Sequence, residues 1–140
     1  IIMNNPSAKA LGTVFEGVAE KVLKENGYKI LERNYKYGRY EIDIIAKKKE
    51  EIAFVEVKSR KDNSYLLPEQ AVNSEKMRHI LYAARGYIRS LYSDGIDVRR
   101  LSYSFDVAAI IYTENFEISS VKYYKDYYVG DKDEILRFAL

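Results

Sequence analysis

Two apolar runs interrupted by charges constrain the fold of this chain more than any other feature of its sequence. The runs are residues 39–46 and 52–60, and the charged segment 47–51 joins them. Short apolar runs rich in Ile and Val, separated by a polar turn, predict a β-hairpin. Both faces of this hairpin carry apolar side chains, which is typical of strands inside a sheet that is covered on both sides. One face would carry Ile42, Ile44, Ala46, Ala53, Val55 and Val57, and the other Ile45, Ile52 and Phe54.

Four charged residues stand inside these runs. Side chains alternate across a strand, so Glu41 shares a face with Asp43, and Glu56 shares a face with Lys58. If the turn is the four residues 48–51, residue 47 pairs with 52, and counting back places Asp43 opposite Glu56 and Glu41 opposite Lys58. Two carboxylates directly opposite each other in a sheet repel, and burial makes this worse because a buried charge needs a partner.

A divalent cation between Asp43 and Glu56 would remove this repulsion, because hard cations bind carboxylate oxygens. Lys58 would then lie beside the cation. Two acids and a lysine suit hydrolysis of a phosphodiester, in which the metal activates a water and the lysine orients that water or stabilises the transition state. The pattern leaves a second interpretation open: the charges form a solvated face, and Glu41 and Lys58 form an ordinary cross-strand ion pair.

The composition limits the kinds of site that are available. The 140 residues suffice for one domain with a core. With no cysteine and a single histidine, a metal must be held mainly by carboxylates, which favours Mg²⁺, Mn²⁺ or Ca²⁺. The net charge of +2 means that any surface for nucleic acid must be local. No apolar run approaches the roughly 18 residues that cross a membrane and no signal peptide is evident, so we expect a cytoplasmic protein without a membrane partner.

Two helical patterns flank the hairpin. Residues 8–26 predict a helix with an apolar stripe that includes Phe15 and with a stop signal at Asn26-Gly27. Glu16 lies at the edge of this stripe, where its side chain could extend along the sheet instead of into bulk water. The alternative is a solvated side chain, which is usual for a helical glutamate. Pro68 is well placed as the first residue of a second helix, which we expect to run to about Tyr92.

The second helix carries a basic face. Helical spacing groups four of its residues: Arg78, Tyr82, Arg85 and Arg89. No acidic residue occurs from Lys76 to Tyr92, and an unbalanced basic face interleaved with tyrosine suits a nucleic-acid backbone. A solvated helix face is the alternative. We expect further contacts to nucleic acid from Lys76 and from Arg60 and Lys61, which begin a loop over residues 59–67.

The remaining patterns complete the fold class. Residues 28–35 predict a strand before the hairpin, 101–112 a buried strand after the second helix, and 116–123 a further strand at the sheet edge. Asp106 interrupts the buried strand, and we interpret it as a structural carboxylate. The order α-β-β-β-α-β predicts an α/β fold with a mixed central sheet flanked by helices. We expect one domain over 1–140, with a disordered lead at 1–7 and a tail at 124–140 that holds a short helix from Asp131.

This order of elements and charges resembles the PD-(D/E)XK nuclease superfamily, which has the restriction-endonuclease-like fold. The motif of that superfamily is an acid followed on the next strand by Asp/Glu-x-Lys, matched here by Asp43 and Glu56-Val57-Lys58. A longer series, over residues 11–112, is similar to the YraN-like family of bacterial and archaeal endonucleases, which is itself similar to archaeal Holliday-junction resolvases in motif spacing. The series is Gly12-x-x-x-Glu16, Gly27-Tyr-x-Ile-Leu-x-Arg-Asn-Tyr35, Glu41-Ile-Asp-Ile-Ile-Ala46, Phe54-Val-Glu-Val-Lys-Ser-Arg60, Ala71-Val72 with Lys76, and Phe105-Asp-Val107.

The resemblance implies a role for each acid. Asp43 and Glu56 would ligate Mg²⁺ or Mn²⁺, and Glu16 would complete the acidic cluster directly or through water. Lys58 would act on the attacking water and the scissile phosphate, and Glu41 would lie at the rim of the site. The family usually has Gly where this chain has Tyr40, a difference that narrows access to the site or changes the local turn.

These features together predict a Mg²⁺- or Mn²⁺-dependent endonuclease whose partner is nucleic acid, in the first place DNA and including branched DNA. One alternative is a nucleic-acid-binding module that keeps the nuclease fold without catalysis. Another is a protein-interaction domain with a structural Glu41–Lys58 ion pair. A homodimer is compatible with the first prediction, because cleavage of a junction needs two sites.

Overall fold

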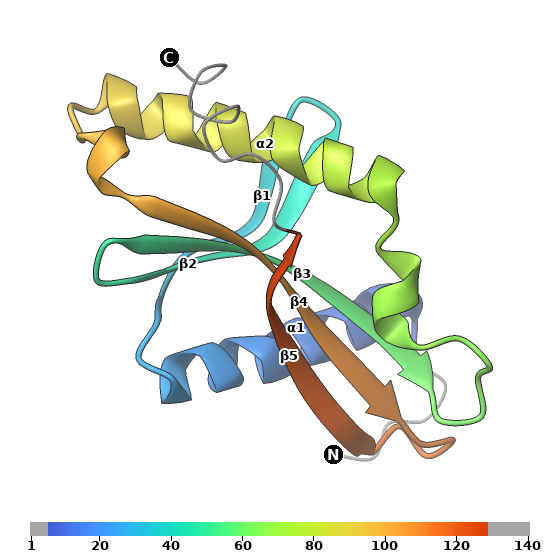
Figure 1. The fold of residues 1–140 in the computed structure, drawn as a ribbon. Helices are drawn as coiled ribbons and strands as arrows, with labels where there is room; N and C mark the ends of the chain where they lie inside the picture. The colour runs from blue at the N-terminus through green and yellow to red at the C-terminus, as the bar shows by residue number, and fades with distance from the viewer. Residues whose placement is uncertain (1–5, 129–140) are drawn as a thin grey trace.

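One five-stranded sheet with a long helix on each face makes up the fold (Figure 1). The structure is a computed structural model and describes residues 6–128. Helix α1 (Ala8–Glu25) packs on one face of the sheet and α2 (Ser74–Ser93) on the other. Both faces of the central strands are therefore buried, which explains why their sequences are apolar on both sides. The predicted mixed α/β sheet flanked by helices is confirmed.

The sheet contains one parallel pair among antiparallel neighbours. Its strands, which follow one another in sequence order across the sheet, are β1 (Lys29–Tyr37), β2 (Tyr40–Lys48), β3 (Glu51–Lys61), β4 (Ser102–Tyr112) and β5 (Ile118–Tyr128). Strands β3 and β4 are parallel, and the other pairs are antiparallel. A parallel step requires a crossover connection, and α2 lies within it. The predicted edge strand is present as β5.

Two apolar layers hold the helices to the sheet. Between α1 and the sheet lie small and branched side chains, such as Ala19, Ile44 and Val55. Between α2 and the sheet lies a larger, more aromatic layer that includes Phe54 and Tyr87. No helix among residues 6–128 is both long and apolar enough to cross a bilayer.

Helix α1 begins and ends close to where the sequence predicts. The side chain of Ser7 caps its first turn by accepting a hydrogen bond of 3.1 Å from the backbone N–H of Ala10. After the C-cap residue Asn26, Gly27 takes a φ of +88°, a left-handed conformation that favours glycine and ends the helix. The disordered lead predicted over 1–7 is therefore wrong for Ser7, while residues 1–5 lie outside the described part.

The second helix is interrupted, contrary to the prediction that it starts at Pro68. Pro68–Ala71 form a short 3₁₀ helix, η1, and α2 starts only at Ser74. Val72, whose ψ of 85° is not helical, is buried between the two. Asn73 then caps α2, because its side chain accepts a hydrogen bond of 2.9 Å from the N–H of Lys76. A second 3₁₀ helix, η2 (Val98–Arg100), precedes β4.

Three strand boundaries also differ from the prediction. The hairpin turn has two residues, Lys49 and Glu50, instead of four, although residue 47 still pairs with 52. Strand β3 continues to Lys61 rather than ending near residue 59, because β4 pairs with it along its whole length. Strand β5 reaches Tyr128 because it pairs with β4 as far as Phe105, so residues 124–128 belong to the sheet and not to a tail. The helix predicted from residue 131 lies outside the described residues.

The sheet splits between β2 and β3. Their pairing runs from Lys48↔Glu51 to Ile44↔Val55 and goes no further. Beyond that point β2 stays with β1 as far as its own first residue, and β3 stays with β4 to the end of both strands. The two halves of the sheet diverge in Figure 1. We call the group of charged residues at this divergence, Asp43, Glu56, Lys58 and Lys76, the notch. The predicted cross-strand pairs of residue 43 with 56 and of 41 with 58 are therefore wrong, because the ladder ends one rung before the first of them.

Candidate active site at the split in the sheet

Three elements bring charged side chains to the notch between β2 and β3. Strand β2 contributes Asp43, strand β3 contributes Glu56 and Lys58, and the first turn of α2 contributes Lys76. The notch is therefore the place where the fold collects the acids and the lysine that the sequence singles out.

Glu56 is the buried centre of this group. Its exposed fraction is only 3%. The Nζ atoms of Lys58 and Lys76 both lie 3.5 Å from its Oε1 atom. Its Oε2 atom is buried and has no hydrogen-bond partner within the described structure. An unpartnered buried oxygen costs about 1–3 kcal/mol, and such an atom calls for an explanation.

Asp43 is held at the split by the backbone of the neighbouring strand. Its Oδ2 atom accepts a hydrogen bond of 2.8 Å from the N–H of Val57. This bond replaces the backbone pairing that β2 and β3 no longer make. It fixes one oxygen of the partly buried carboxylate and places the side chain beside Glu56.

Both acids at the notch favour protonation more than ordinary carboxyl groups do. Burial, with the charge of Asp43 acting in the same direction, raises the pKa of Glu56 to about 7. The lysines at positions 58 and 76 oppose this rise without cancelling it. Burial also raises the pKa of Asp43, against the lowering effect of the Val57 hydrogen bond. Burial is the main cause of both shifts, so a cation bound at the notch would favour the charged form of each acid.

Glu16 approaches the same region from α1. Burial is the main cause that raises its pKa, and the charge of Asp43 is the next. A hydrogen bond with the side chain of Asn34 acts in the opposite direction. Asn34 lies in β1 with a φ of +50°, a left-handed conformation that asparagine adopts more readily than most residues. Sequence reasoning gave Asn34 no role, and the only signal for it is its place in the motif before the hairpin.

Glu41 does not pair with Lys58. It is partly exposed at the start of β2, and its charge contributes to raising the pKa of Asp43. Lys58 instead forms its ion pair with Glu56. The structural Glu41–Lys58 ion pair, considered above as an alternative for these charges, is thus absent from the described part of the chain.

The residues at the notch fit a hydrated divalent cation better than a preformed protein cage. Among residues 6–128, no three acidic or histidine side chains are grouped closely enough to form such a cage. Mg²⁺, however, usually keeps several waters and binds through one or two carboxylates plus substrate phosphates. The unpartnered Oε2 atom of Glu56 and the neighbouring Asp43 supply two such carboxylates. Glu16 could contribute through water.

Lys76, which we expect to contact nucleic acid, reaches the acid pair: its Nζ atom lies 3.5 Å from the Oε1 atom of Glu56. The basic face further along α2 is present, with Arg78, Tyr82 and Arg89 exposed. Arg85 is partly buried, and its guanidinium lies 5.4 Å from the centre of the Tyr82 ring.

The two basic residues at the end of β3 point in different directions. By strand alternation Arg60 shares the face of Glu56, and its guanidinium donates a hydrogen bond of 3.1 Å to the carbonyl of Ser59. Lys61 lies on the other face, with its Nζ 5.5 Å from the centre of the Phe116 ring. Only Arg60 is therefore on the side of the acid pair.

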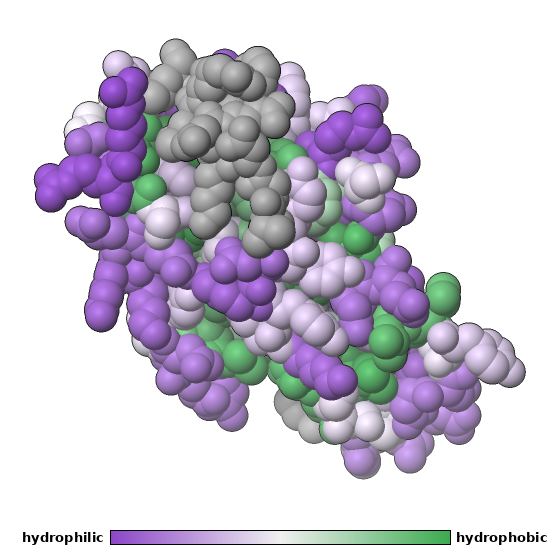
Figure 2. Space-filling model, viewed as in Figure 1, coloured by the Kyte–Doolittle hydropathy of each residue, from purple (hydrophilic) through white to green (hydrophobic). Residues whose placement is uncertain are grey.

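The loop after β3 exposes apolar side chains next to this end of the sheet. Leu66 and Leu67 are 58% and 50% exposed. In Figure 2 apolar residues gather on the visible face where this loop lies in Figure 1, whereas strongly hydrophilic residues cover both ends of α2.

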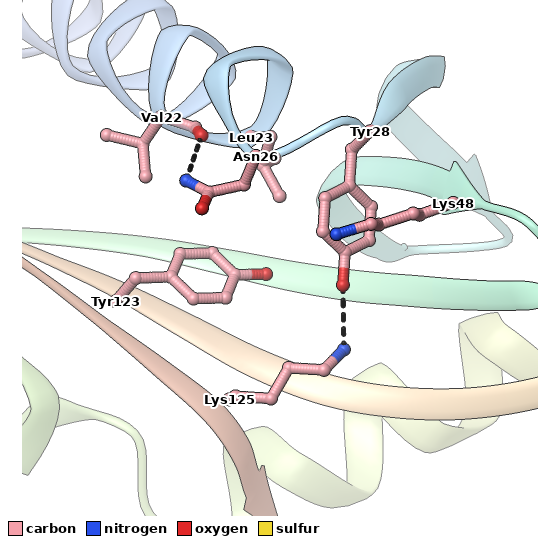
Figure 3. Close-up of a pocket in the computed structure, with 7 residues that line it drawn as sticks. All are labelled: Val22, Leu23, Asn26, Tyr28, Lys48, Tyr123 and Lys125. Atoms are coloured by element: carbon pink, nitrogen blue, oxygen red, sulfur yellow. Dashed lines mark hydrogen bonds between the residues drawn. The ribbon is translucent and has the colours of Figure 1, made fainter.

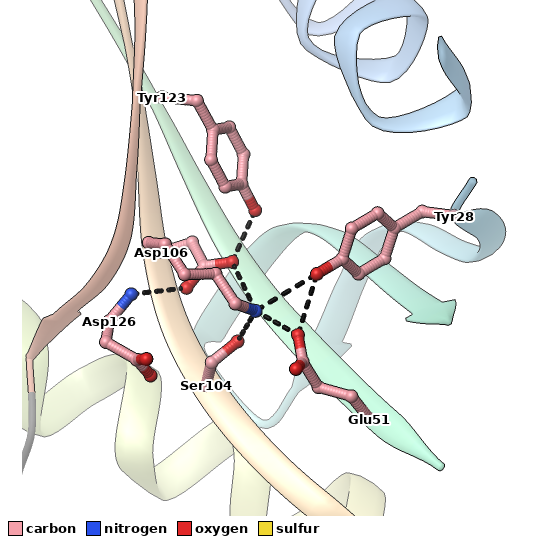
Figure 4. A network of polar contacts seen from close by, with 7 residues as sticks. Tyr28, Glu51, Ser104, Asp106, Tyr123 and Asp126 are labelled. Carbon is pink, nitrogen blue, oxygen red and sulfur yellow. Dashed lines mark hydrogen bonds and ion pairs between the residues drawn. The ribbon is translucent and has the colours of Figure 1, made fainter. Parts of the chain in front are cut away.

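A second polar cluster lies at the opposite end of β3, and its members form hydrogen bonds and ion pairs with one another (Figure 4). Asp106, 2% exposed, accepts hydrogen bonds from the Tyr123 hydroxyl and from the N–H of Asp126. Lys125 lies 3.5 Å from Asp106 and also contacts Glu51. Each buried charge here has partners, which supports the interpretation of Asp106 as a structural carboxylate.

A pocket of about 270 Å³ adjoins this cluster, at the end of α1 (Figure 3). Tyr28, Tyr123 and Lys125 line it, and Lys125 donates a hydrogen bond of 3.1 Å to the Tyr28 hydroxyl. The hydroxyl groups on its wall are therefore already hydrogen-bonded, that of Tyr28 to Lys125 and that of Tyr123 to Asp106. From Glu51 to Glu56 along β3 the separation is about 17 Å, so this pocket is not part of the notch.

The fold and the notch define a mixed α/β protein with a buried pair of acids at a split in its sheet, faced by two lysines. The chain belongs to the uncharacterised protein family UPF0102, whose sequence model matches residues 15–110. This is the YraN-like family that the motif series resembles.

Similar proteins carry the same family name. A UPF0102 protein of Chloroherpeton thalassium is 43% identical over 106 residues, covering 76% of this chain and 78% of that one. A UPF0102 protein of Clostridium beijerinckii is 40% identical over 117 residues, covering 81% and 91%. Among solved structures, SfsA of Pyrococcus furiosus in complex with Ca²⁺ matches with a TM-score of 0.41 and 16% identity, covering 85% of this chain and 64% of that one.

Proposed function

We propose that this protein is a metal-dependent nuclease of the PD-(D/E)XK superfamily that hydrolyses phosphodiester bonds inside nucleic acid, with DNA as its substrate. The observation that carries the proposal is the state of Glu56: a carboxylate that is 3% exposed, with two lysines at one oxygen and no partner at the other. A purely structural ion pair would be expected to satisfy both oxygens.

The acids and lysines of the notch have separate tasks in the proposed reaction. Asp43 and Glu56 would hold Mg²⁺ or Mn²⁺, which when bound activates water and neutralises charge on the phosphoryl group. Hydrolysis adds water across one P–O bond and yields a phosphate monoester and an alcohol. Lys58, whose side chain is 30% exposed, can donate to a phosphate oxygen from its place beside Glu56. Lys76 holds the same carboxylate oxygen from α2.

The positive charge of the surface near the notch is suited to binding a polyanionic substrate. Helix α2 runs from Lys76 without any acidic residue to Tyr92, and its exposed arginines at 78 and 89 continue the positive charge. Such a face attracts a phosphate backbone irrespective of sequence. The notch would then receive one phosphate of a bound strand.

The proposal is tested with a cleavage panel in Mn²⁺ and Mg²⁺ that contains single-stranded, duplex, flapped and four-way-junction DNA, and RNA. Wild type is compared with Asp43→Asn and Lys58→Ala, and with Glu50→Gln as a control in the exposed hairpin turn. We expect wild type and the control to cut at least one DNA substrate, and the two notch variants to be slower by at least about 100-fold. Equal cleavage by wild type and Lys58→Ala would overturn the proposal.

One observation favours a second candidate, a nucleic-acid-binding module without catalysis. Lys58 and Lys76 already provide two positive charges at Glu56, so the carboxylate is partly neutralised without a metal. This candidate requires the α2 face but not Asp43. It is favoured if Arg78→Glu and Arg89→Glu abolish DNA binding while Asp43→Asn changes no activity at all. Lys21→Glu, on the exposed side of α1, is the control for the charge change.

A further inference from the structure

Four aromatic rings form a continuous patch on the surface between α2 and the β1–β2 turn. The aromatic patch consists of Tyr37, Tyr40, His79 and Tyr82. The rings of Tyr40 and His79 stack with their centres 4.6 Å apart, and Tyr82 meets Tyr40 edge to face at 5.3 Å. Tyr37 adjoins Tyr82 at 5.8 Å. Tyr82 is 48% exposed, and the other three rings are partly exposed.

The aromatic patch is continuous with the acid notch. On β2, Tyr40 directly precedes Glu41, and on α2, His79 follows Lys76 by three residues, on the same side of the helix. His79 is therefore about one helical turn along α2 from the lysine whose Nζ lies 3.5 Å from Glu56. Tyr82 lies six residues after Lys76, about 9 Å along the helix axis. A stacked strand advances about 3.4 Å per nucleotide, so this distance spans two to three nucleotides.

Positive charges border the aromatic patch. The Arg39 guanidinium lies 5.3 Å from the centre of the Tyr40 ring, and that of Arg85 lies 5.4 Å from the centre of the Tyr82 ring. Arg78, which is exposed, precedes His79 in the same helix. A patch that docked another protein through apolar contacts would not need this border of arginines. Rings flanked by arginine suit a ligand with flat bases and a phosphate backbone.

Base-paired DNA cannot use such a patch fully, because both faces of each base are already stacked in the duplex. An unpaired base has an open face, and stacking it on an aromatic side chain is worth about 1–3 kcal/mol. A surface that holds a phosphate at one end and offers exposed rings two to three nucleotides away is therefore selective for strands with unpaired nucleotides.

We propose that the aromatic patch stacks an unpaired nucleotide two to three nucleotides from the phosphate bound at the notch, so that the protein selects single-stranded or branched DNA over continuous duplex. This inference rests on the proposed function and specifies its substrate class. It assigns Tyr82 and the stacked Tyr40–His79 pair to substrate selection and leaves the hydrolysis to the residues of the notch.

The test measures binding by fluorescence anisotropy with EDTA present, so that no cleavage occurs. The probes are a single-stranded oligonucleotide, a duplex of the same length and the same duplex with a single-stranded flap. The proteins are wild type, Tyr82→Ala and Tyr82→Phe, with Tyr92→Ala as a control at the far end of α2, where Tyr92 is 59% exposed. We expect wild type to prefer the flapped and single-stranded probes. Tyr82→Ala should weaken their binding by about 5- to 100-fold without affecting the duplex, and Tyr82→Phe should restore it.

The outcomes separate this inference from the proposed function. A preference lost in Tyr82→Ala and kept in Tyr82→Phe supports the aromatic patch, even if no substrate is cut in Mn²⁺ and the nuclease proposal fails. If wild type binds all probes equally, the proposed role of the aromatic patch is wrong. The same holds if Tyr82→Ala prefers the flapped and single-stranded probes as strongly as wild type does. The nuclease proposal can still stand in that case, on the cleavage panel alone.

Discussion

The carboxylate of Asp43 accepts a hydrogen bond of 2.8 Å from the backbone N–H of Val57, one rung beyond the last pair of β2 and β3. A side chain thus takes over the bond that the backbone would otherwise make. The exchange lets the two strands diverge and fixes Asp43 beside Glu56. It also explains how an acid is retained inside a sheet whose central residues are mostly apolar.

Replacement of Asp43 separates its structural role from its chemical role. Asp43→Asn keeps an oxygen that can accept the Val57 hydrogen bond, whereas Asp43→Ala leaves that N–H without a partner. We expect the alanine variant to be less stable than the asparagine variant by about 1–3 kcal/mol in urea unfolding, and both to lack cleavage. If the alanine variant is as stable as the asparagine variant, the hydrogen bond between Asp43 and Val57 does not stabilise the divergence of β2 and β3.

The stability of the metal-free protein should fall as the pH rises from about 5 to 8. Burial raises the pKa of Glu56 to about 7 in the folded state, above its ordinary value of 4.5. Between these values the folded protein holds a proton that the unfolded chain has lost, so the free energy of unfolding decreases with pH. We expect a loss on the order of 1–3 kcal/mol, measured by urea unfolding in EDTA.

Two variants identify the group responsible for this pH dependence. Glu56→Gln should reduce the loss strongly, and Glu50→Gln, at an exposed position, should leave it unchanged. Asp43 contributes in the same direction, because its pKa is also raised, so a smaller slope should remain in Glu56→Gln. An identical slope in wild type and Glu56→Gln would show that Glu56 is not the buried group that titrates.

Gly86 should tolerate no side chain. A Cβ atom at this position of α2 would lie 2.3 Å from the Cδ2 atom of the Tyr37 ring, so the ring would have to move. We expect Gly86→Ala to lower the stability by about 1–3 kcal/mol and to weaken binding to the flapped probe, because Tyr37 is part of the aromatic patch. Gly17→Ala in α1 is the matched control, since a Cβ there meets nothing within 4 Å. It should be neutral or stabilising, and equal stability of the two variants would contradict this account.

Asp106 should be important for stability and unimportant for cleavage. Asp106→Ala would leave the Tyr123 hydroxyl and the Asp126 N–H without their acceptor. We expect a loss of about 2–4 kcal/mol in thermal or urea unfolding, with cleavage per folded molecule unchanged at low temperature. Tyr123→Phe removes only one of the hydrogen-bond partners of Asp106, so it should lower the free energy of unfolding by less than Asp106→Ala does. A loss of cleavage in a folded Asp106→Ala protein would place this residue in the reaction.

The register of the hairpin could be predicted from the sequence because two independent patterns agree on it. The alternation of apolar residues assigns the side chains from Ile44 to Val55 to the correct faces, although Ile42 packs in the α2 layer and not with Ile44 as predicted. The charged turn fixes which residues pair. Residue 47 pairs with 52 as predicted, although the turn itself has two residues rather than four. The number and direction of the other strands followed from the same apolar runs and from the crossover helix.

The split of the sheet could not be predicted, because it depends on contacts between distant segments. The tip of the β1–β2 hairpin packs on α2 through Tyr37, whereas β3 follows β4 along its whole length. Because of these two contacts, β2 and β3 diverge. Both contacts join segments far apart in the chain, so no local sequence pattern indicates the divergence. For the same reason the sequence placed Asp43 directly opposite Glu56 and gave no sign that Lys76 reaches Glu56 from helix α2, which packs on that face of the sheet.

The most direct test of the central claim is a calorimetric titration of Mn²⁺ into the protein at pH 8, where Glu56 is largely deprotonated. Wild type, Asp43→Asn and Glu50→Gln are compared without nucleic acid. We predict one binding site in wild type and in Glu50→Gln, and its loss in Asp43→Asn. An absence of Mn²⁺ binding in wild type, or unchanged binding in Asp43→Asn, would contradict the claim that the notch is a metal site.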